Sequence, residues 1–119
     1  MKNIGLYIHF PFCASKCPYC DFYSFRSDEE TRRKYAEAVI RELKNQSKKY
    51  NRKADTLYLG GGTPSLMGSG LLCGIINEAK ADFLTDSAEI TVECNPHSLE
   101  NGLFEKLRAV GVNRISLGL

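Results

Sequence analysis

Three cysteines stand close together near the beginning of the chain, in the segment Cys13-Ala-Ser-Lys-Cys17-Pro-Tyr-Cys20. Three thiolates at this spacing suit an iron-sulfur cluster, and three protein ligands leave one iron of a four-iron cluster open. An open iron can bind a substrate or a cofactor directly. The spacing therefore indicates chemistry at this segment as well as structure.

Two further cysteines lie apart from this group, which makes five in all. An odd number argues against a complete disulfide framework, and clustered cysteines in a reducing compartment more often bind metal. Cys73 falls within the helical apolar pattern of residues 71–79, and Cys94 alternates with Ile90 and Val92. We expect both to be small buried apolar side chains rather than metal ligands.

Two other short segments carry residues suited to ligand binding. Residues 60–64 read Gly-Gly-Gly-Thr-Pro, and residues 93–96 read Glu-Cys-Asn-Pro. Glycines let the backbone approach a ligand closely and offer amide donors and carbonyl acceptors, although a tight turn from a strand to a helix would need the same residues. Glu93 could accept hydrogen bonds from a hydroxyl or an amine.

The composition is that of an ordinary globular protein. The chain has 119 residues, of which 43% are hydrophobic and 25% are charged, and this length suits one domain. The net charge is only +2, so we interpret the basic residues between 44 and 53 as a solvated helix end and expect no nucleic-acid partner. The sequence shows neither a secretory signal nor an apolar run long enough to span a bilayer, which favours a cytoplasmic location and reduced cysteines.

Strand and helix signals alternate along the whole chain. Strands are expected at residues 5–10, 56–59, 89–94 and 114–117. Helices are expected after a capping box at residues 27–30, near residues 70–81, and after a cap at Ser98, with Gly111 at the end of the last helix. Short strands separated by helices predict an α/β fold with a parallel sheet and right-handed crossovers.

The two faces of the expected strands differ in character. Side chains of one parity are apolar and should pack against the helices; they are Leu6, Ile8, Phe10, Leu57, Leu59, Ile90, Val92, Ile115 and Leu117. Side chains of the other parity are largely polar; they are Tyr7, His9, Tyr58, Gly60, Thr91, Glu93, Asn95, Ser116 and Gly118. A doubly wound sheet should be apolar on both faces. We therefore expect parallel (β/α) repeats that form a barrel or partial barrel with a polar lumen.

The three candidate segments each follow or end a different strand. Parallel strands place their carboxyl ends at one rim, which is where ligands bind in parallel α/β architectures. The cysteine segment, residues 60–64 and residues 93–96 should therefore converge on one site.

Five segments match the pattern of one known family, in the order that is typical of it. They are residues 6–13 (Leu-Tyr-Ile-His-Phe-Pro-Phe-Cys), 17–24 (Cys-Pro-Tyr-Cys-Asp-Phe-Tyr-Ser), 57–65 (Leu-Tyr-Leu-Gly-Gly-Gly-Thr-Pro-Ser), 90–96 (Ile-Thr-Val-Glu-Cys-Asn-Pro) and 111–118 (Gly-Val-Asn-Arg-Ile-Ser-Leu-Gly). Together with the cysteine spacing, they resemble the radical S-adenosylmethionine (SAM) proteins, in the branch of the oxygen-independent coproporphyrinogen III oxidases and the haem chaperones. The resemblance implies that residues 1–119 are the N-terminal portion of a radical SAM core domain with a partial TIM-like barrel.

The resemblance also implies the roles of individual residues. Cys13, Cys17 and Cys20 would hold three irons of a 4Fe-4S cluster, and the fourth iron would chelate the amino and carboxylate groups of SAM. Reduction of the cluster then cleaves SAM to methionine and a 5′-deoxyadenosyl radical, which abstracts hydrogen from a substrate. The SAM contacts would come from Tyr7, Tyr19, Gly61, Gly62, Thr63 and Glu93. His9 could donate a proton or a hydrogen bond near the cluster, or be an interior histidine without a chemical role.

One position bears on the choice of function within this branch. The oxidases carry a further cysteine two residues after the third cluster cysteine, and here that position is Phe22. The chain also begins only three residues before its first strand signal, whereas the oxidases have a longer leader. Both differences favour the haem-chaperone-like group, whose members bind haem for delivery to other proteins through segments that would lie after residue 119.

The partners implied by the resemblance are SAM, an electron donor such as a flavodoxin or a ferredoxin, and haem or a porphyrin in a full-length protein. A chain that stops before its barrel is complete would be a fragment, not competent in catalysis alone and prone to self-association through the open sheet edge. Two alternatives stay open. One is a catalytic oxidase of the same branch, and the other is a binding module with a structural zinc site or an electron-transfer cluster. Zinc would need a fourth ligand, such as His9 or Asp21.

Overall fold

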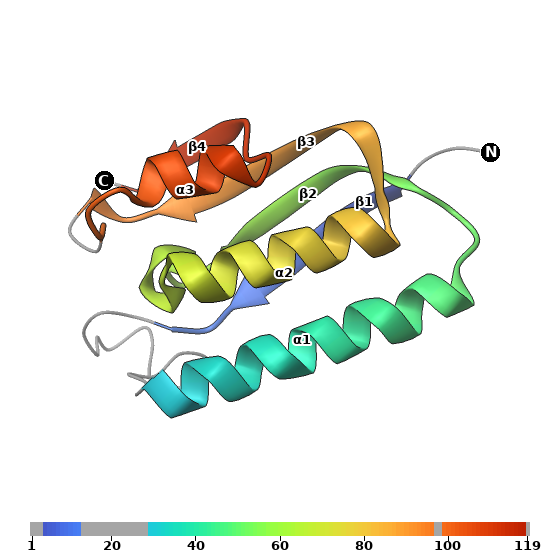
Figure 1. Ribbon diagram of the computed structural model, residues 1–119, viewed down its shortest axis with the longest axis horizontal. Helices are drawn as coiled ribbons and strands as arrows, with labels where there is room; N and C mark the ends of the chain where they lie inside the picture. Colours follow the sequence, from blue (N-terminus) through green and yellow to red (C-terminus); the bar gives the residue numbers. More distant parts are fainter. Residues whose placement is uncertain (1–3, 13–28, 97–98, 119) are drawn as a thin grey trace.

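A parallel sheet of four strands forms the centre of the protein. The computed structural model describes residues 4–12, 29–96 and 99–118. The strands are β1 (Ile4–Phe10), β2 (Ala54–Gly61), β3 (Leu84–Cys94) and β4 (Arg114–Leu117), in the order β1-β2-β3-β4, and all their pairings are parallel. Figure 1 shows that the strand arrows point to the same end of the sheet. The predicted α/β fold with parallel (β/α) repeats is confirmed.

The helices lie side by side over one face of this sheet (Figure 1). They are α1 (Glu29–Lys49), α2 (Ser69–Asp82) and α3 (Leu103–Ala109), and a short 3₁₀ helix, η2 (Pro64–Met67), precedes α2. Although α1 has 21 residues, none of the helices within the described ranges combines the length and the apolar character that crossing a membrane requires.

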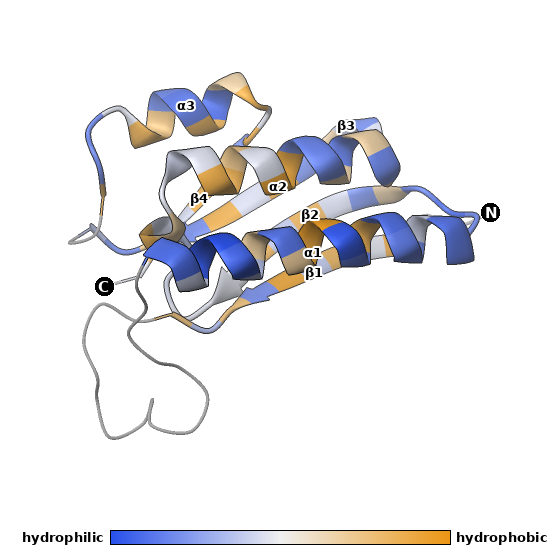
Figure 2. Cartoon of the chain, turned by 60° about the horizontal axis from the view of Figure 1, so that its bottom comes forward, coloured by the Kyte–Doolittle hydropathy of each residue, from blue (hydrophilic) through white to orange (hydrophobic). Residues whose placement is uncertain are grey.

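Helix α1 follows the charge pattern that favours a helix at both ends. Its first turn carries two glutamates and its last turn carries Lys48 and Lys49, so both ends complement the helix dipole. Ala36 and Leu43 are buried on its inner side, while most of its outer residues are hydrophilic (Figure 2). The serine of the expected capping box, Ser27, lies outside the described residues.

The hydrophobic core lies between the sheet and the helices. The apolar parity of the strands supplies much of it, with Ile8, Phe10, Leu57, Leu59, Ile90 and Val92 all buried. Leu6 and Ile115 are partly buried against this core. Leu117 is 52% exposed, so the expectation that it packs against a helix is wrong for the part of the chain described. The alternation of the strands thus predicted the buried face of the sheet at all positions but this one.

Strand β3 begins five residues earlier than the sequence pattern predicts. Residues 85–87 are Thr-Asp-Ser, a polar run that resembles a loop. In the sheet, Ala54 pairs with Leu84 but Thr56 pairs with Glu89, so β3 bulges between these two pairs. The side chain of Asn113 holds the bulge in place, because its Oδ1 accepts a hydrogen bond from Ile90 N at 2.8 Å and its Nδ2 donates to the Ala88 carbonyl at 3.0 Å.

The sequence pattern predicts the start of α3 wrongly and its end correctly. The helix begins at Leu103 with Gly102 as its N-cap, so the predicted cap at Ser98, a residue outside the described ranges, is wrong. Gly111 follows the helix with a φ of +112°, as expected of a glycine just past a helix C-terminus. Lys80 of α2 donates from Nζ to the Val110 carbonyl at 2.8 Å and so stabilises the same helix end.

Candidate functional site

A cavity of about 590 Å³ opens at the carboxyl end of the sheet. It is lined by residues 61–63 at the end of β2, residues 93–96 at the end of β3, and Ser116 and Gly118 of the β4 end. Sequence reasoning predicted that the glycine segment and the Glu-Cys-Asn-Pro segment would meet at one rim, and this meeting is observed. The cavity is therefore built from three successive strand ends, where a parallel sheet leaves its ligand site.

The glycine segment also pairs with the stretch of chain that follows β1. Gly62 N donates to the Phe10 carbonyl at 2.7 Å, and Thr63 N donates to the Phe12 carbonyl at 2.8 Å. A Cβ atom on Gly62 would lie 2.5 Å from the Phe12 carbonyl oxygen, so only glycine allows this approach. Because Phe12 directly precedes Cys13 in the sequence, these hydrogen bonds bring the start of the cysteine segment to the edge of the glycine segment.

Among the described residues that line the cavity, Glu93 alone is charged. Its Oε1 accepts a hydrogen bond from Gly61 N at 3.1 Å, and its Oε2 accepts one from the Tyr58 hydroxyl at 2.6 Å. Gly61 has a φ of +115°, a backbone conformation that other residues rarely adopt. The carboxylate and the glycine turn thus fix one another at the mouth of the cavity.

Tyr7 and His9 lie beside the cavity but do not line it. The Tyr7 ring stacks on the Tyr58 ring with their centroids 5.9 Å apart, and the Tyr7 hydroxyl lies 3.2 Å from His9 Nδ1. The His9 ring packs against Gly61, because a Cβ atom on that glycine would lie 2.7 Å from the imidazole. From α1, the Tyr35 hydroxyl donates to the His9 carbonyl, and burial raises the pKa of Tyr35 above its ordinary value.

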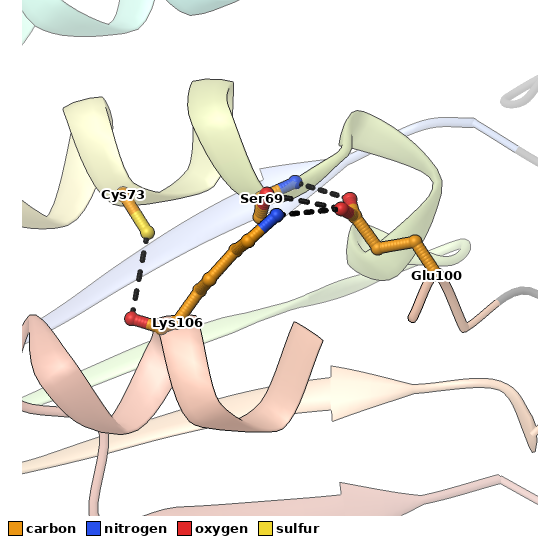
Figure 3. A network of polar contacts seen from close by, with 4 residues as sticks. All are labelled: Ser69, Cys73, Glu100 and Lys106. Carbon is orange, nitrogen blue, oxygen red and sulfur yellow. Dashed lines mark hydrogen bonds and ion pairs between the residues drawn. The ribbon is translucent and has the colours of Figure 1, made fainter. Parts of the chain in front are cut away.

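Glu100 connects the loop after β3 to the N-terminus of α2 (Figure 3). Its carboxylate accepts hydrogen bonds from Ser69 N at 2.7 Å and Ser69 Oγ at 3.1 Å, and Lys106 Nζ lies 3.5 Å from it. The hydrogen bond from the Ser69 amide holds the pKa of the Glu100 carboxyl below its ordinary value. Because α2 follows the glycine segment, Glu100 ties together two of the segments that form the cavity.

The two isolated cysteines behave differently from one another. Cys94 is 3% exposed, as expected, and burial raises the pKa of its thiol to about 11. Cys73 is only half-buried, so the expectation of a fully buried side chain is wrong for it. Its Sγ lies 3.7 Å from the Lys106 carbonyl at the junction of α2 and α3 (Figure 3).

Several of the predicted site residues lie outside the described residues. They are Cys13, Cys17, Tyr19, Cys20 and Phe22. Within residues 4–12, 29–96 and 99–118, no group of three or more His, Cys, Asp or Glu side chains is arranged to hold a metal ion. The cluster ligands therefore remain a prediction from the cysteine spacing.

Sequence reasoning did not single out Tyr58, which contacts Glu93 from the neighbouring strand. Ser65 was not singled out either, although its Oγ accepts a hydrogen bond from Asn95 N at 3.3 Å. Tyr58 belongs to the polar parity of β2, which places it on the lumen face. That signal cannot identify its partner, because the contact depends on the register between β2 and β3.

Comparison with known proteins bears directly on this site. The model of the Radical SAM superfamily matches residues 7–119. The chain belongs to the radical SAM superfamily. Membership of this superfamily implies a 4Fe-4S cluster and SAM as cofactors, and it argues against the alternative of a zinc-binding module.

Individual radical SAM relatives support the same placement. The chain is 40% identical to "Heme chaperone HemW" of Buchnera aphidicola subsp. Acyrthosiphon pisum and 38% identical to that of Escherichia coli, over its whole length in both cases. Coproporphyrinogen III oxidase (HemN) from Escherichia coli, described as a radical SAM enzyme, superposes with a TM-score of 0.87 and 28% identity over 98% of the chain. The chain spans about a third of the length of the HemW relatives (32%) and 28% of the HemN chain.

The cavity fits the cofactor that superfamily membership implies. Its volume of about 590 Å³ lies within the range of roughly 300–1,000 Å³ that is usual for small-molecule sites. Glu93 presents a carboxylate to the cavity, a group that can accept hydrogen bonds from amines and hydroxyls such as those of SAM. Gly61 and Gly62 line the cavity without side chains of their own, and the space that a Cβ atom would take at each is filled by His9 and by the Phe10 and Phe12 carbonyls.

Proposed function

We propose that this chain binds a 4Fe-4S cluster through Cys13, Cys17 and Cys20 and binds SAM in the cavity at the ends of β2, β3 and β4. The observation that carries the proposal is the hydrogen bond between Gly61 N and Glu93 Oε1, which unites the glycine segment and the acidic segment at one cavity. The hydrogen bond from Thr63 N to the Phe12 carbonyl supports the proposal, because it holds the residue before Cys13 beside the glycine segment that lines the cavity.

The residues of this chain would mainly bind and orient. Glu93 accepts hydrogen bonds from SAM, and the backbone around Gly61, Gly62 and Thr63 approaches it closely. Tyr7 and Tyr19 would supply aromatic contacts. When bound and reduced, the cluster supplies the electron that cleaves SAM. His9 would donate a hydrogen bond near this site, in keeping with its contact with Gly61.

We further propose that the protein is of the haem-chaperone type rather than an oxidase. Relatives named heme chaperone share up to 40% identity with the chain, and Phe22 stands where the oxidases carry a further cysteine. The oxidase alternative is favoured by the TM-score of 0.87 to the HemN structure. Haem titration followed by visible absorption, and consumption of coproporphyrinogen III followed by chromatography, separate the two proposals on a full-length form that contains this chain. Haem binding without coproporphyrinogen consumption supports the chaperone, and consumption refutes it.

Reconstitution tests the cofactor proposal. The chain is incubated anaerobically with ferrous iron and sulfide, and its iron content, visible absorption and electron paramagnetic resonance spectrum are recorded with and without SAM. We expect a 4Fe-4S cluster whose reduced spectrum changes when SAM is added. Cys17→Ala should abolish the cluster, whereas Cys73→Ala, which changes a half-buried cysteine between α2 and α3, should keep it.

A matched pair of glutamates on β3 tests the SAM site. Glu93→Ala should weaken the effect of SAM on the spectrum, whereas Glu89→Ala should not, because Glu89 lies on the same strand but pairs with Arg114 at 3.7 Å outside the cavity. Equal cluster content in wild type and Cys17→Ala would refute the cluster assignment. Equal SAM response in both glutamate variants would refute the SAM site.

Two further partners follow from the same proposal. An electron donor such as a flavodoxin or a ferredoxin would reduce the cluster, which is tested by mixing the reduced donor with the reconstituted chain and recording the spectrum. Self-association is proposed through β1 and β4, the outermost strands of the described sheet. Sedimentation velocity at increasing protein concentration tests it, and a constant monomer mass would refute it.

A further inference from the structure

The carboxylate of Glu93 is held by two donors from the neighbouring strand. Gly61 N of β2 donates to one oxygen, and the Tyr58 hydroxyl, also on β2, donates to the other, while Glu93 itself belongs to β3. The Tyr58 contact is the shorter of the two, at 2.6 Å against 3.1 Å. An ionised carboxylate has about four acceptor positions, so the two donors from β2 leave others that no donor in residues 4–12, 29–96 and 99–118 is shown to occupy. Glu93 is thus restrained without being fully occupied.

The ring of Tyr58 is itself fixed by its surroundings. On one side it stacks on Tyr7, with an interplanar angle of 18°. It also lies close to Gly60, where an added Cβ atom would sit 2.8 Å from Tyr58 Cε1 and 3.0 Å from Glu93 Oε1. Gly60 therefore leaves the space in which the phenol and the carboxylate meet. Tyr7 and Gly60 thus direct the Tyr58 hydroxyl toward Glu93.

We propose that Tyr58 is a positioning residue that sets the orientation of the Glu93 carboxylate for SAM, an inference that rests on the proposed role of Glu93 as a SAM contact. A glutamate side chain has several rotatable bonds, and a ligand that had to fix them would lose affinity. The Tyr58 hydroxyl fixes them before the ligand arrives. The ring of Tyr58 also keeps its place when the hydroxyl is removed, because Tyr7 holds it by stacking.

The titration behaviour of Tyr58 agrees with this arrangement. The hydrogen bond to Glu93 raises the pKa of Tyr58 above its ordinary value, and this is the largest contribution to the shift. The raised pKa of Tyr58 arises in the protein without cluster or SAM. It therefore gives a spectroscopic signature of the contact that does not depend on cluster or SAM.

Four variants test the inference: Tyr58→Phe, Glu93→Ala, the double variant, and Tyr50→Phe as a matched control at an exposed tyrosine after α1. Thermal melting first establishes that each variant folds. Equilibrium dialysis with labelled SAM on the anaerobically reconstituted chain then gives the dissociation constants. Tyr58→Phe should weaken SAM binding by about threefold to tenfold, the cost of immobilising one flexible side chain. It should have no further effect in the Glu93→Ala background.

A second measurement uses the ligand-free chain. The six tyrosines are labelled at Cζ with ¹³C and titrated by nuclear magnetic resonance, and the Tyr58 signal is identified by its absence from Tyr58→Phe. We expect the Tyr58 titration to move to lower pH in Glu93→Ala. If Tyr58 had only a structural role, Glu93→Ala would not shift the Tyr58 titration. Removing the Tyr58 hydroxyl would then also still weaken SAM binding in the Glu93→Ala background.

The outcomes separate the inference from the function on which it rests. No SAM binding by the wild-type chain overturns the proposed function and the inference with it. Normal SAM binding by Tyr58→Phe, while Glu93→Ala binds weakly, overturns the inference alone. An equal loss on removing the Tyr58 hydroxyl with and without Glu93 also overturns it, because the hydroxyl would then act on SAM by another route. An unchanged Tyr58 titration in Glu93→Ala overturns the contact itself.

Discussion

Replacing Gly62 with alanine tests the closest backbone approach in the site. The new Cβ atom would lie 2.5 Å from the Phe12 carbonyl oxygen and 3.1 Å from the Phe10 carbonyl oxygen. A carbon and an oxygen normally approach no closer than about 3.3 Å. Both obstacles are backbone atoms, so no side-chain rotation can relieve the overlap. The chain after β1 must therefore move away from the glycine segment.

The expected cost follows from the contacts that this movement breaks. Gly62 N and Thr63 N would lose hydrogen bonds of 2.7 and 2.8 Å, each worth about 1 kcal/mol, and overpacking adds about 1 kcal/mol or more. We expect the free energy of unfolding to fall by about 2–4 kcal/mol. With an entropy of unfolding of about 2.1 cal/mol/K per residue, the 119-residue chain should lose roughly 8–16 °C in melting temperature.

The assay is thermal and urea unfolding of the cofactor-free protein, followed by circular dichroism. Gly74→Ala is the matched control, because an added Cβ at this position in α2 meets nothing within 4 Å. Alanine is the better helix former, so this control should be more stable than the wild type by about 0.5–1 kcal/mol. A Gly62→Ala protein that melts within about 2 °C of the wild type would refute the reasoning, since the expected loss in melting temperature is roughly 8–16 °C.

Three other predictions concern residues around the site. Asn113→Ala should lower the free energy of unfolding by about 1–3 kcal/mol in urea, because both backbone hydrogen bonds that hold the β3 bulge are lost; an unchanged midpoint would contradict this. The pKa of Glu100 is lowered by the Ser69 amide, so its stabilising contribution is complete above about pH 5 and is lost as the pH falls through that lowered value. The difference in melting temperature between the wild type and Glu100→Gln should accordingly shrink from pH 7 to pH 3, and a constant difference would count against the contact. Iodoacetamide at pH 8 should modify Cys73 before Cys94, whose pKa of about 11 and burial keep it protonated and covered, as peptide mass spectrometry can measure; faster labelling of Cys94 would show that its strand opens.

The sequence predicted the fold well where alternation was strong and poorly where polar residues entered a strand. The buried face of β2 could be predicted because Leu57 and Leu59 alternate with residues of another character. The early part of β3 could not, since its polar residues occupy a bulge that depends on Asn113, a residue far along the chain. Thr91 shares the polar parity with Glu93 and is 1% exposed, so exposure alone does not distinguish the two faces of β3.

The candidate site was predictable as far as topology alone determines it. Parallel strands require their carboxyl ends to share a rim, so the meeting of Gly61 and Glu93 followed from the order of the elements. The contact between Tyr58 and Glu93 did not, because it needs the register in which Leu57 pairs with Ile90. The approach of Phe12 to Gly62 likewise depends on backbone geometry that residue types do not encode.

The order β1-β2-β3-β4 also has a consequence for how the sheet assembles. Ile4 of β1 pairs with Ala54, 50 residues later, whereas Thr91 of β3 pairs with Arg114, only 23 residues later. The longer loop costs roughly 0.7 kcal/mol more chain entropy to close. We therefore expect β1 to dock last and to open first. In native-state hydrogen exchange, β1 amides that bond to β2 should exchange at lower free energy than those of β3, and equal protection would contradict this order. β1, the strand that precedes the cysteines, would then be the most readily released part of the sheet. Binding of a cluster by the cysteines would therefore also stabilise the pairing of β1 with β2.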